Sequence, residues 1–583
     1  MWTEPPDRST SIQPATPAGD DARRRRVAWV MLAVILMASL GLKLNHIGHD
    51  ALHAMDEAFH AVVARNLLDR PLTPLLYADP AVPYDYRDWK ANHVWLHKPI
   101  LPLWQMAGAM AVLGVEPWVM RLPSALLATG VAWLVYLLGA GWFGRGVGLI
   151  AAFLAAVNPS MHTLVHGYIF SDHVDVALVF YVTLSAVLSA RAAGTGQWTD
   201  AATAGVATGL AFLSKTYPGL IVAGVVTLMA LLRLTGRCGS IGQFCLSGRQ
   251  WTAFAAGAAL SAGPWLVACA IRFPREFWYE QAHALMHLTR DVEQFAAPWD
   301  RTVADYLLRL NHVFFAPLLV SLVLAGVRAW RRRDGRLLFL LLWWCGVVAV
   351  FSLATSKTPT ATAIALPAGW LILAATAGRA LTGDRVALAG LATCLVVGVF
   401  WPGAFPRQGW GYPPGGGFAS VLRENLWPWM HAALGVIAAI VAAALGRFGG
   451  GSAGRRDYAG CVLATLLLPC VWLAYQHART AWRITEQNRT TPTFRELGQL
   501  ASDRLPRDAI LLIEETAKFQ HVMAMFWTSR ACYPLGDAGL PVAVQPFLAM
   551  GRPVYLVSLS ERPLPSVGLA DGRVIYRVPE MGW

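Results

Sequence analysis

Charged side chains are scarce in this sequence. They account for 14% of its 583 residues, while 56% are hydrophobic, and soluble globular domains usually carry about 25% charged residues. This composition excludes a chain that water surrounds over most of its surface. The 25 Trp residues agree with a lipid environment, because Trp concentrates at membrane–water interfaces. We therefore expect an integral membrane protein.

Several patterns of known chemistry are also missing. The eight Cys residues lie mostly within or beside apolar runs and show no C-x-x-C spacing, which argues against a disulfide framework and a zinc site. The glycine-rich segment 449–454 lacks the Gly-Lys-Ser/Thr ending of a phosphate-binding loop. The net charge of +13 could indicate nucleic-acid binding, but the Arg residues stand mostly in short connections between apolar runs. Orientation in a membrane explains that distribution, so we expect no nucleic-acid partner.

Long apolar runs are what the sequence has instead. Crossing a bilayer takes about 20 apolar residues, and about thirteen runs approach or reach that length. They lie near residues 27–45, 117–141, 145–160, 172–192, 200–215, 217–234, 251–271, 311–330, 337–354, 359–379, 385–403, 428–447 and 458–476. The shorter run at 99–114 contains Pro99 and Pro102, so we expect it to lie half-embedded at the membrane surface, with a full span as the alternative.

Basic residues set the predicted orientation. When the Arg residues at 23–26 are placed in the cytoplasm and the spans alternate, every inside connection carries Arg, as the positive-inside rule requires. The first apolar run resembles a signal peptide, but no cleavage motif follows it, so we expect a retained helix. An odd number of spans then places the C-terminus outside. We expect a multi-pass protein of the inner (plasma) membrane.

The sequence predicts three regions. Residues 1–26 are polar and rich in Pro, Ser and Thr, which favours a disordered cytoplasmic N-terminus. Residues 27–480 form a transmembrane domain with a long outer loop at 46–116. The tail is richer in charge, and its apolar runs at 509–513 and 553–558 are typical of short strands. We therefore expect a small extracytoplasmic α/β domain at 485–583.

Ionisable residues that interrupt apolar context gather on the predicted outer side. They are Asp56, Glu57, Lys98, Asp172, Asp175, Lys215, His287, Arg290 and Lys357. Ionisable groups close to lipid are costly, which makes them functional candidates. Cations can stabilise a phosphate leaving group, and a carboxylate can accept the proton of an attacking hydroxyl or amine. Because nucleotide sugars are not expected outside the cytoplasm, this charge set favours a polyprenyl-phosphate sugar donor.

Five local patterns within about residues 50–370 sharpen this interpretation. They are Asp56-Glu57, the segment His97-Lys98-Pro99-Ile100-Leu101-Pro102-Leu103-Trp104 with Arg121-Leu122-Pro123-Ser124 after it, Gly167 to Asp172, Gly209 to Lys215, and Ser356-Lys357-Thr358-Pro359. In this order they resemble the motifs of the GT-C-fold glycosyltransferases, the superfamily of protein O-mannosyltransferases and lipid A aminoarabinose transferases. The resemblance implies a cell-envelope enzyme that moves a hexosyl or pentosyl group from a polyprenyl-phosphate carrier to a lipid, glycan or protein acceptor. It also implies inversion at the anomeric carbon and no metal or other cofactor.

The same resemblance assigns roles to single residues. Asp56 is the candidate base, and Glu57 and Asp172 complete the catalytic set. The donor phosphate would contact Lys98, His287, Arg290 and Lys357, with Asp175 and Lys215 as secondary candidates. The sequence departs from the family pattern at Ile100, where a second Pro is common, and at 360–363, where an aromatic residue is common. These departures concern the substrate more than the reaction class.

Simpler interpretations exist for the same residues. Asp172 suits the N-cap of a helix, and Lys98 could be an interfacial lysine with its charge in water. His283 and His287 stand four residues apart and could form a metal pair, but no third ligand is evident. A polytopic transporter or flippase of a lipid-linked or anionic substrate is the alternative function. Transporters bind substrates near mid-membrane between internal repeats, whereas these groups lie at helix ends on one side and no repeat is visible.

Overall fold

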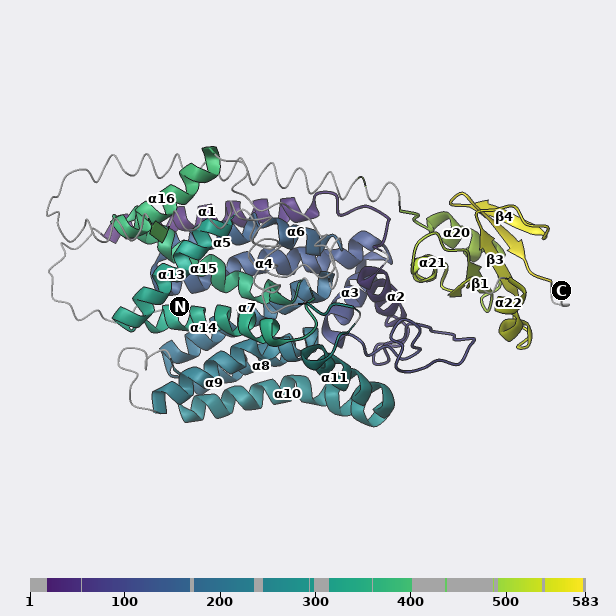
Figure 1. Ribbon diagram of the computed structural model, residues 1–583, viewed down its shortest axis with the longest axis horizontal. Coiled ribbons are helices and arrows are strands. Elements are labelled where there is room, and N and C mark those ends of the chain that lie inside the picture. The colour runs from purple at the N-terminus through teal and green to yellow at the C-terminus, as the bar shows by residue number, and fades with distance from the viewer. Residues whose placement is uncertain are drawn as a thin grey trace.

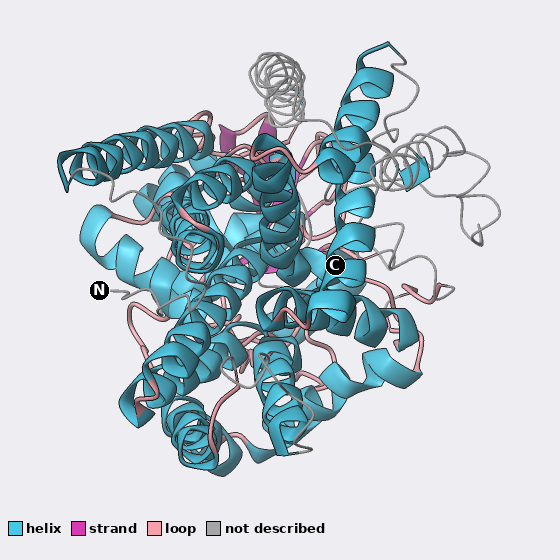
Figure 2. Ribbon diagram, turned by 90° about the vertical axis from the view of Figure 1, so that its left-hand side faces the viewer, coloured by secondary structure: helices cyan, strands magenta, loops and turns pink. Residues whose placement is uncertain are grey.

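The computed structural model describes residues 18–53, 55–167, 172–234, 245–292, 294–297, 314–358, 360–400, 436–437, 486, 491–536 and 540–579. Most of them form a helical bundle that runs along the long axis of the molecule, with the C-terminal strands at one end (Figure 1). When the opposite end faces the viewer, many helices are seen nearly end-on and the strands lie behind them (Figure 2).

Seven described helical segments are long and apolar enough to span a membrane. They are α1 (Ala18–Leu44, apolar from Ala22), α4 (Pro117–Phe143), α7 (Asp172–Thr195), η1 with α9 (Tyr217–Leu220 and Ile221–Leu234), α10 (Gly248–Arg272), α14 (Gly335–Leu353), and η5 with α15 (Ala361–Ala365 and Leu366–Leu381). Helices α5 (Arg145–Ala156) and α6 (Pro159–Val165) meet at a bend of 49° and make an eighth span if they are counted together.

The predicted number of about thirteen spans is not confirmed. Apart from residues 436–437, the expected spans near 428–447 and 458–476 lie outside the described residues. Helices also form at other expected positions, as α8 (Trp198–Lys215), α13 (Phe315–Arg332) and α16 (Arg385–Phe400), but they do not reach the length and apolarity of the seven. The surface segment forms a helix of 14 residues, α3 (Ile100–Leu113). Helix α1 already begins at Ala18, inside the region expected to be disordered.

Small residues let α8 and α10 pack closely. A Cβ atom at Gly205 would lie 1.9 Å from the Phe254 carbonyl oxygen, and one at Gly257 would lie 2.2 Å from the carbonyl oxygen of Ala202. Such contacts between small residues are typical of helix pairs in membranes. Because α8 ends at Lys215, this packing also fixes the position of a predicted site residue.

Two short helices near the end that carries the strands hold further polar residues. Helix α2 (Asp56–Asn66) has Asp56 and Glu57 in its first turn, where the helix dipole favours negative charge. Helix α11 (Pro274–Thr289) follows α10 directly, and its first residue is a proline, which suits the first turn of a helix.

The C-terminal region contains the predicted strands. Strands β1 (Ile510–Ile513) and β3 (Val554–Ser558) match the apolar runs expected to be strands. They belong to a five-stranded sheet of order β2-β1-β3-β5-β4, which also contains β2 (Ala531–Pro534), β4 (Ser566–Ala570) and β5 (Arg573–Arg577). β1 pairs with β2 and β3 in parallel, while β5 pairs with β3 and β4 antiparallel. Helices α20 (Arg495–Arg504), α21 (Gln520–Thr528) and α22 (Leu540–Leu548) complete the domain.

This domain packs on the first long loop rather than standing apart. Phe59 of α2 and Phe526 of α21 lie in one continuous cluster of buried residues. The Arg65 guanidinium donates hydrogen bonds to the carbonyl oxygens of Met525 and Phe526. The rings of Tyr77 and Tyr533 stack with centroids 5.0 Å apart. The domain therefore shares a core with α2, the helix that carries Asp56.

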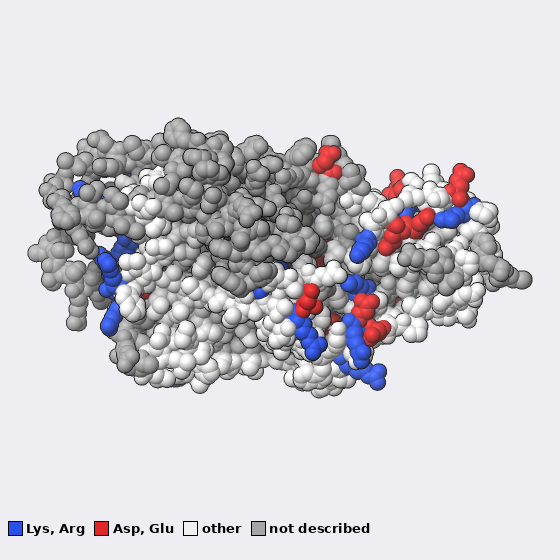
Figure 3. Space-filling model, in the orientation of Figure 1, with Lys and Arg blue, Asp and Glu red and all other residues white. Residues whose placement is uncertain are grey.

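The surface of the described residues agrees with a membrane-embedded middle. In Figure 3, basic residues gather at the left end, and acidic and basic residues mix at the right end near the strands. The visible described surface between these ends is largely without charge. Such an uncharged band between two charged ends is expected of a bundle that crosses a bilayer.

Candidate active site

Asp56 and Lys98 form the centre of the candidate site. Asp56 is the first residue of α2, and Lys98 precedes Pro99, the N-cap of α3, whose ring keeps the residue before it extended. The Lys98 Nζ lies 3.9 Å from Asp56 Oδ2, and both side chains keep a small exposed fraction, 15% and 10%. A carboxylate and an ammonium group thus stand together at the edge of a buried region.

The charges around Asp56 keep it ionised. Burial raises the pKa of its carboxyl. The nearby cationic groups lower that pKa by more than burial raises it, so the pKa lies below its ordinary value; these groups are Lys98, His60, His97 and Lys215. Lys215 in turn forms an ion pair with Asp175 of α7, whose side chain is buried. Four of the predicted site residues, Asp56, Lys98, Asp175 and Lys215, are therefore brought together.

A row of polar groups continues from Lys98 to α11. Lys98 Nζ lies 3.3 Å from His97 Nε2, and His97 Nδ1 lies 3.2 Å from Glu280 Oε2. The Trp89 ring stacks on His97 with centroids 4.4 Å apart, which holds the imidazole in place. Burial raises the pKa of Glu280 to about 7, although His283 and Lys98 lower it in part. Glu280 is thus a carboxyl group that titrates near neutral pH.

His97, Glu280 and His283 could hold a metal ion. One donor atom from each lies within 4.8 Å of the others, and in the described part of the chain Glu280 Oε1 accepts no hydrogen bond. Two imidazoles and a carboxylate are a common ligand set for zinc. The sequence spacing suggested a metal pair of His283 with His287. The group in the structure instead joins His283 to His97 and Glu280, while His287 Nδ1 lies 3.1 Å from the His283 carbonyl oxygen.

Glu57 occupies a different environment from its neighbour Asp56. Its side chain is fully buried, and Arg121 Nε donates to its Oε1 over 2.7 Å. Burial raises its pKa, but Arg121 and His173 more than offset that effect and hold the pKa well below the ordinary value. Glu57 therefore faces the protein interior.

The remaining predicted residues lie at the ends of α7, α11 and α14. Asp172 is the first residue of α7. His287 is in the last turn of α11, and Arg290 follows it with an exposed side chain. Lys357 is buried, and its Nζ donates to the carbonyl oxygens of Ser352 and Ala354.

Several backbone hydrogen bonds tie the Lys357 segment to the end of α11 and the residues after it. The Ser356 amide donates to the His287 carbonyl over 3.0 Å, and the Lys357 amide donates to the Phe295 carbonyl over 2.8 Å. The Ser356 hydroxyl also donates to the Arg290 carbonyl over 2.8 Å. Three residues predicted to contact phosphate, His287, Arg290 and Lys357, therefore belong to one pair of joined segments.

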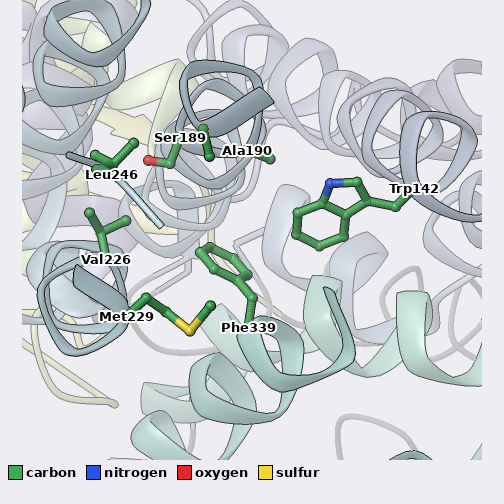
Figure 4. Close-up of a pocket in the computed structure, with 8 residues that line it drawn as sticks. Trp142, Ser189, Ala190, Val226, Met229, Leu246 and Phe339 are labelled. Atoms are coloured by element: carbon green, nitrogen blue, oxygen red, sulfur yellow. The ribbon is translucent and has the colours of Figure 1, made fainter. Parts of the chain in front are cut away.

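A small cavity of about 30 Å³ adjoins Lys98. Phe212, Trp265, Leu266 and Phe277 supply apolar walls, and Lys98 and Glu280 supply polar groups. A second cavity, of about 10 Å³, lies among Trp142, Ser189, Val226, Met229 and Phe339 (Figure 4). That second cavity contains none of the predicted site residues, so the first is the one that belongs to the site.

Sequence reasoning gave no role to four residues of this region: His97, Arg121, His173 and Glu280. Arg121 belongs to the segment Arg121-Leu122-Pro123-Ser124, near the start of an apolar span. That position could have indicated its role, because a buried Arg needs an acidic partner. Glu280 and His283 stand three residues apart on one helix, but nothing in the sequence places His97 beside them.

Comparison with known proteins bears on the family likeness and the fold of this chain. Residues 97–243 match the family model described as dolichyl-phosphate-mannose-protein mannosyltransferase. An undecaprenyl phosphate-alpha-4-amino-4-deoxy-L-arabinose arabinosyl transferase of Pseudomonas fluorescens (strain Pf0-1) is 29% identical over 47% of this chain and 47% of its own length. A putative mannosyltransferase of Bacillus subtilis is 26% identical over 34% of this chain and 27% of its own. The chain thus spans about half the length, or less, of these curated relatives.

A solved structure covers nearly the whole chain. ArnT from Cupriavidus metallidurans bound to undecaprenyl phosphate has a TM-score of 0.60 to this chain at 16% sequence identity, and the match covers 94% of this chain and 97% of ArnT. The chain therefore has the GT-C fold that its motifs predict, with a small sheet domain at its C-terminal end. The fold prediction is confirmed.

Proposed function

We propose that this chain is a membrane glycosyltransferase that moves a sugar from a polyprenyl-phosphate carrier to an acceptor. The observation that carries the proposal is the Asp56–Lys98 pair, 3.9 Å apart, whose lysine lines a small and largely apolar cavity. An apolar wall suits the isoprenoid chain, and an ammonium group at its rim suits the phosphate. The names of the relatives agree, since several act on undecaprenyl-phosphate aminoarabinose.

The reaction follows from the charges. The acceptor oxygen or nitrogen attacks the anomeric carbon, and the bond from that carbon to the phosphate oxygen breaks. Asp56, ionised in the resting site, accepts the proton that the acceptor loses. The bonding electrons leave with polyprenyl phosphate, whose additional negative charge Lys98 stabilises. Attack from the side opposite the phosphate inverts the anomeric carbon.

The other candidate residues take supporting roles in this proposal. Lys215, paired with Asp175, adds positive charge near Asp56. His287, Arg290 and Lys357 lie in the joined segments at the ends of α11 and α14, where they would contact the phosphate from a second side once Lys357 releases the carbonyl oxygens of Ser352 and Ala354. Asp172, at the N-terminus of α7, would help to shape the sugar or acceptor site.

We propose that the end of the bundle bearing α2 and the sheet domain faces outward. The opposite end carries clusters of Arg at the end of α13 and the start of α14, and such clusters favour the cytoplasmic side. The protein would then lie in the inner (plasma) membrane with a cytoplasmic N-terminus. The acceptor would be a lipid, glycan or protein of the cell envelope.

The test is turnover by the purified protein in lipid with a panel of radiolabelled polyprenyl-monophosphate sugars. An amino-pentose donor comes first, because the curated relatives use one. Release of polyprenyl phosphate by the wild type, with Asp56→Asn inactive, supports the enzyme and names the sugar. If no donor releases polyprenyl phosphate and a labelled lipid moves across the membrane of proteoliposomes, the protein is a transporter or flippase rather than a transferase.

A further inference from the structure

Glu57 follows Asp56 directly in the chain, but both oxygens of its carboxylate already contact protein donors. Oε1 accepts a hydrogen bond from Arg121 Nε over 2.7 Å and lies 3.4 Å from His173 Nε2. Oε2 accepts the His53 backbone N–H over 2.7 Å. The side chain has no exposed surface, whereas that of Asp56 keeps 10%. A carboxylate enclosed in this way has no face left for a substrate.

Arg121 binds the segment between α1 and α2 as well as Glu57. One of its terminal nitrogens donates to the carbonyl oxygens of Ile47 (3.2 Å) and His49 (2.7 Å), and the other donates to that of Ala51 (2.7 Å). The chain from residue 47 to 53 therefore winds around a single buried guanidinium. Because a buried charge that loses its partner is strongly destabilising, Glu57 and Arg121 must be kept together.

Gly167 closes the remaining side of the Glu57 carboxylate. Its φ is +67°, and a Cβ atom there would lie 2.3 Å from Glu57 Cδ. His173 reaches the carboxylate from the start of α7, and its Nδ1 lies 2.7 Å from the Ser124 hydroxyl of α4. The carboxylate thus joins α2, α4, the segment before α7 and α7 itself at one point.

We propose that Glu57 is a positioning residue which, held by Arg121, His173 and Gly167, fixes the start of α2 so that Asp56 points toward Lys98 and the cavity. We call these four residues the Glu57 clamp. The inference rests on the proposed function, since it assigns the base role to Asp56 alone. It replaces the expectation that Glu57 itself acts on the substrate. Through His173 the clamp also sets where α7 begins, and with it Asp172.

The clamp can be disturbed without altering any side chain that would touch the substrate. Gly167→Ala places a methyl group against the Glu57 carboxylate. Gly196→Ala is the matched control, because Gly196 has a similar φ of +71° and no atom within 4 Å of its Cβ position. Both substitutions strain the backbone alike, and only the first pushes on Glu57. A displaced catalytic group costs up to about a hundredfold in rate.

We expect Gly167→Ala to lower kcat by roughly ten- to a hundredfold while the KM for the donor changes less than about threefold. Gly196→Ala should keep both constants. Hydrogen–deuterium exchange should be faster at residues 47–58 in Gly167→Ala than in Gly196→Ala. Glu57→Gln, which keeps the shape but lacks one acceptor, serves as a second variant if Gly167→Ala does not fold. It should show the same faster exchange and retain more activity than Asp56→Asn.

The outcomes separate the clamp from the proposed function. If the wild type transfers no sugar, the proposed function fails, but the exchange measurement still decides whether the clamp orders residues 47–58. If the wild type is active and Gly167→Ala matches Gly196→Ala in both kcat and exchange, the clamp is overturned. It is also overturned if Glu57→Gln is as inactive as Asp56→Asn while its exchange stays at the wild-type level, since Glu57 would then act on the substrate directly.

Discussion

Replacing Lys98 separates the two effects that the structure assigns to its ammonium group. Lys98→Met keeps most of the volume of the side chain and removes its charge. The first effect concerns the donor, because a hydrogen bond to a charged group contributes about 1.5–3 kcal/mol. This corresponds to roughly a ten- to 150-fold rise in the KM for the donor. Lys90→Met is a matched control, because Lys90 lies on the same loop with an exposed side chain.

The second effect concerns Asp56. At 3.9 Å and an effective dielectric constant of about 20, the Lys98 charge stabilises the carboxylate by at most about 4 kcal/mol. His60, His97 and Lys215 remain in the variant and solvent reaches the pair, so we expect the pKa of Asp56 to rise toward its ordinary value by less than this limit implies.

The sign of the pH effect follows from that shift. The pKa of Asp56 is depressed in the wild type, so the base stays ionised well into the acid range and is lost only below its ordinary pKa. In Lys98→Met the loss begins at higher pH. The ratio of variant to wild-type kcat/KM should therefore be constant near neutral pH and fall on the acid limb of the profile, which begins at higher pH in the variant. A ratio that stays constant over the whole acid limb, with an unchanged KM for the donor, would refute both assignments.

Three further predictions concern other parts of the molecule. Asp56→Asn should lower kcat by about 10²–10⁴-fold with little change in melting temperature, since it keeps the shape of the side chain; steady-state kinetics beside a thermal-shift measurement checks both. EDTA should leave transfer unchanged, because Asp56 and Lys98 supply the proposed chemistry; loss of activity that zinc restores would direct attention to His97, Glu280 and His283. Arg65→Ala should destabilise the packing of the C-terminal domain by about 2–3 kcal/mol, because it removes the hydrogen bonds to Met525 and Phe526, and faster proteolysis of that domain than in the wild type would reveal it; equal proteolysis rates would contradict the role of Arg65.

Local patterns in the sequence predicted the parts of this fold that local physics decides. The apolar runs at 509–513 and 553–558 became β1 and β3, because short, continuous apolar runs bounded by turns suit strands that are buried on both faces of a sheet. The charged residues were predicted to share one side of the membrane, and four of them form two pairs. Asp56 and Lys98 pair within one loop, and Asp175 and Lys215 pair at the facing ends of adjacent helices.

Other features depended on distances that a sequence does not contain. Asp56 and Glu57 are neighbours with the same chemistry, yet one pairs with Lys98, which lines a cavity, and the other binds Arg121 in the interior. Their difference depends on the contacts of Glu57 with Arg121 of α4 and His173 of α7, which join residues far apart in the sequence. The sequence did not determine the number of membrane spans. Helices such as α13 combine an apolar run with several Arg residues, so their length and apolarity fall close to the limit for a span.

The most direct test of the account is a single-turnover reaction of the purified protein in lipid with an undecaprenyl-phosphate sugar and a crude envelope acceptor fraction. Mass spectrometry would follow the released undecaprenyl phosphate and the glycosylated product in wild type and Asp56→Asn. The account predicts that both products appear in equal amounts with the wild type and that Asp56→Asn forms both at least about a hundredfold more slowly. Equal amounts of product from the two proteins would contradict it.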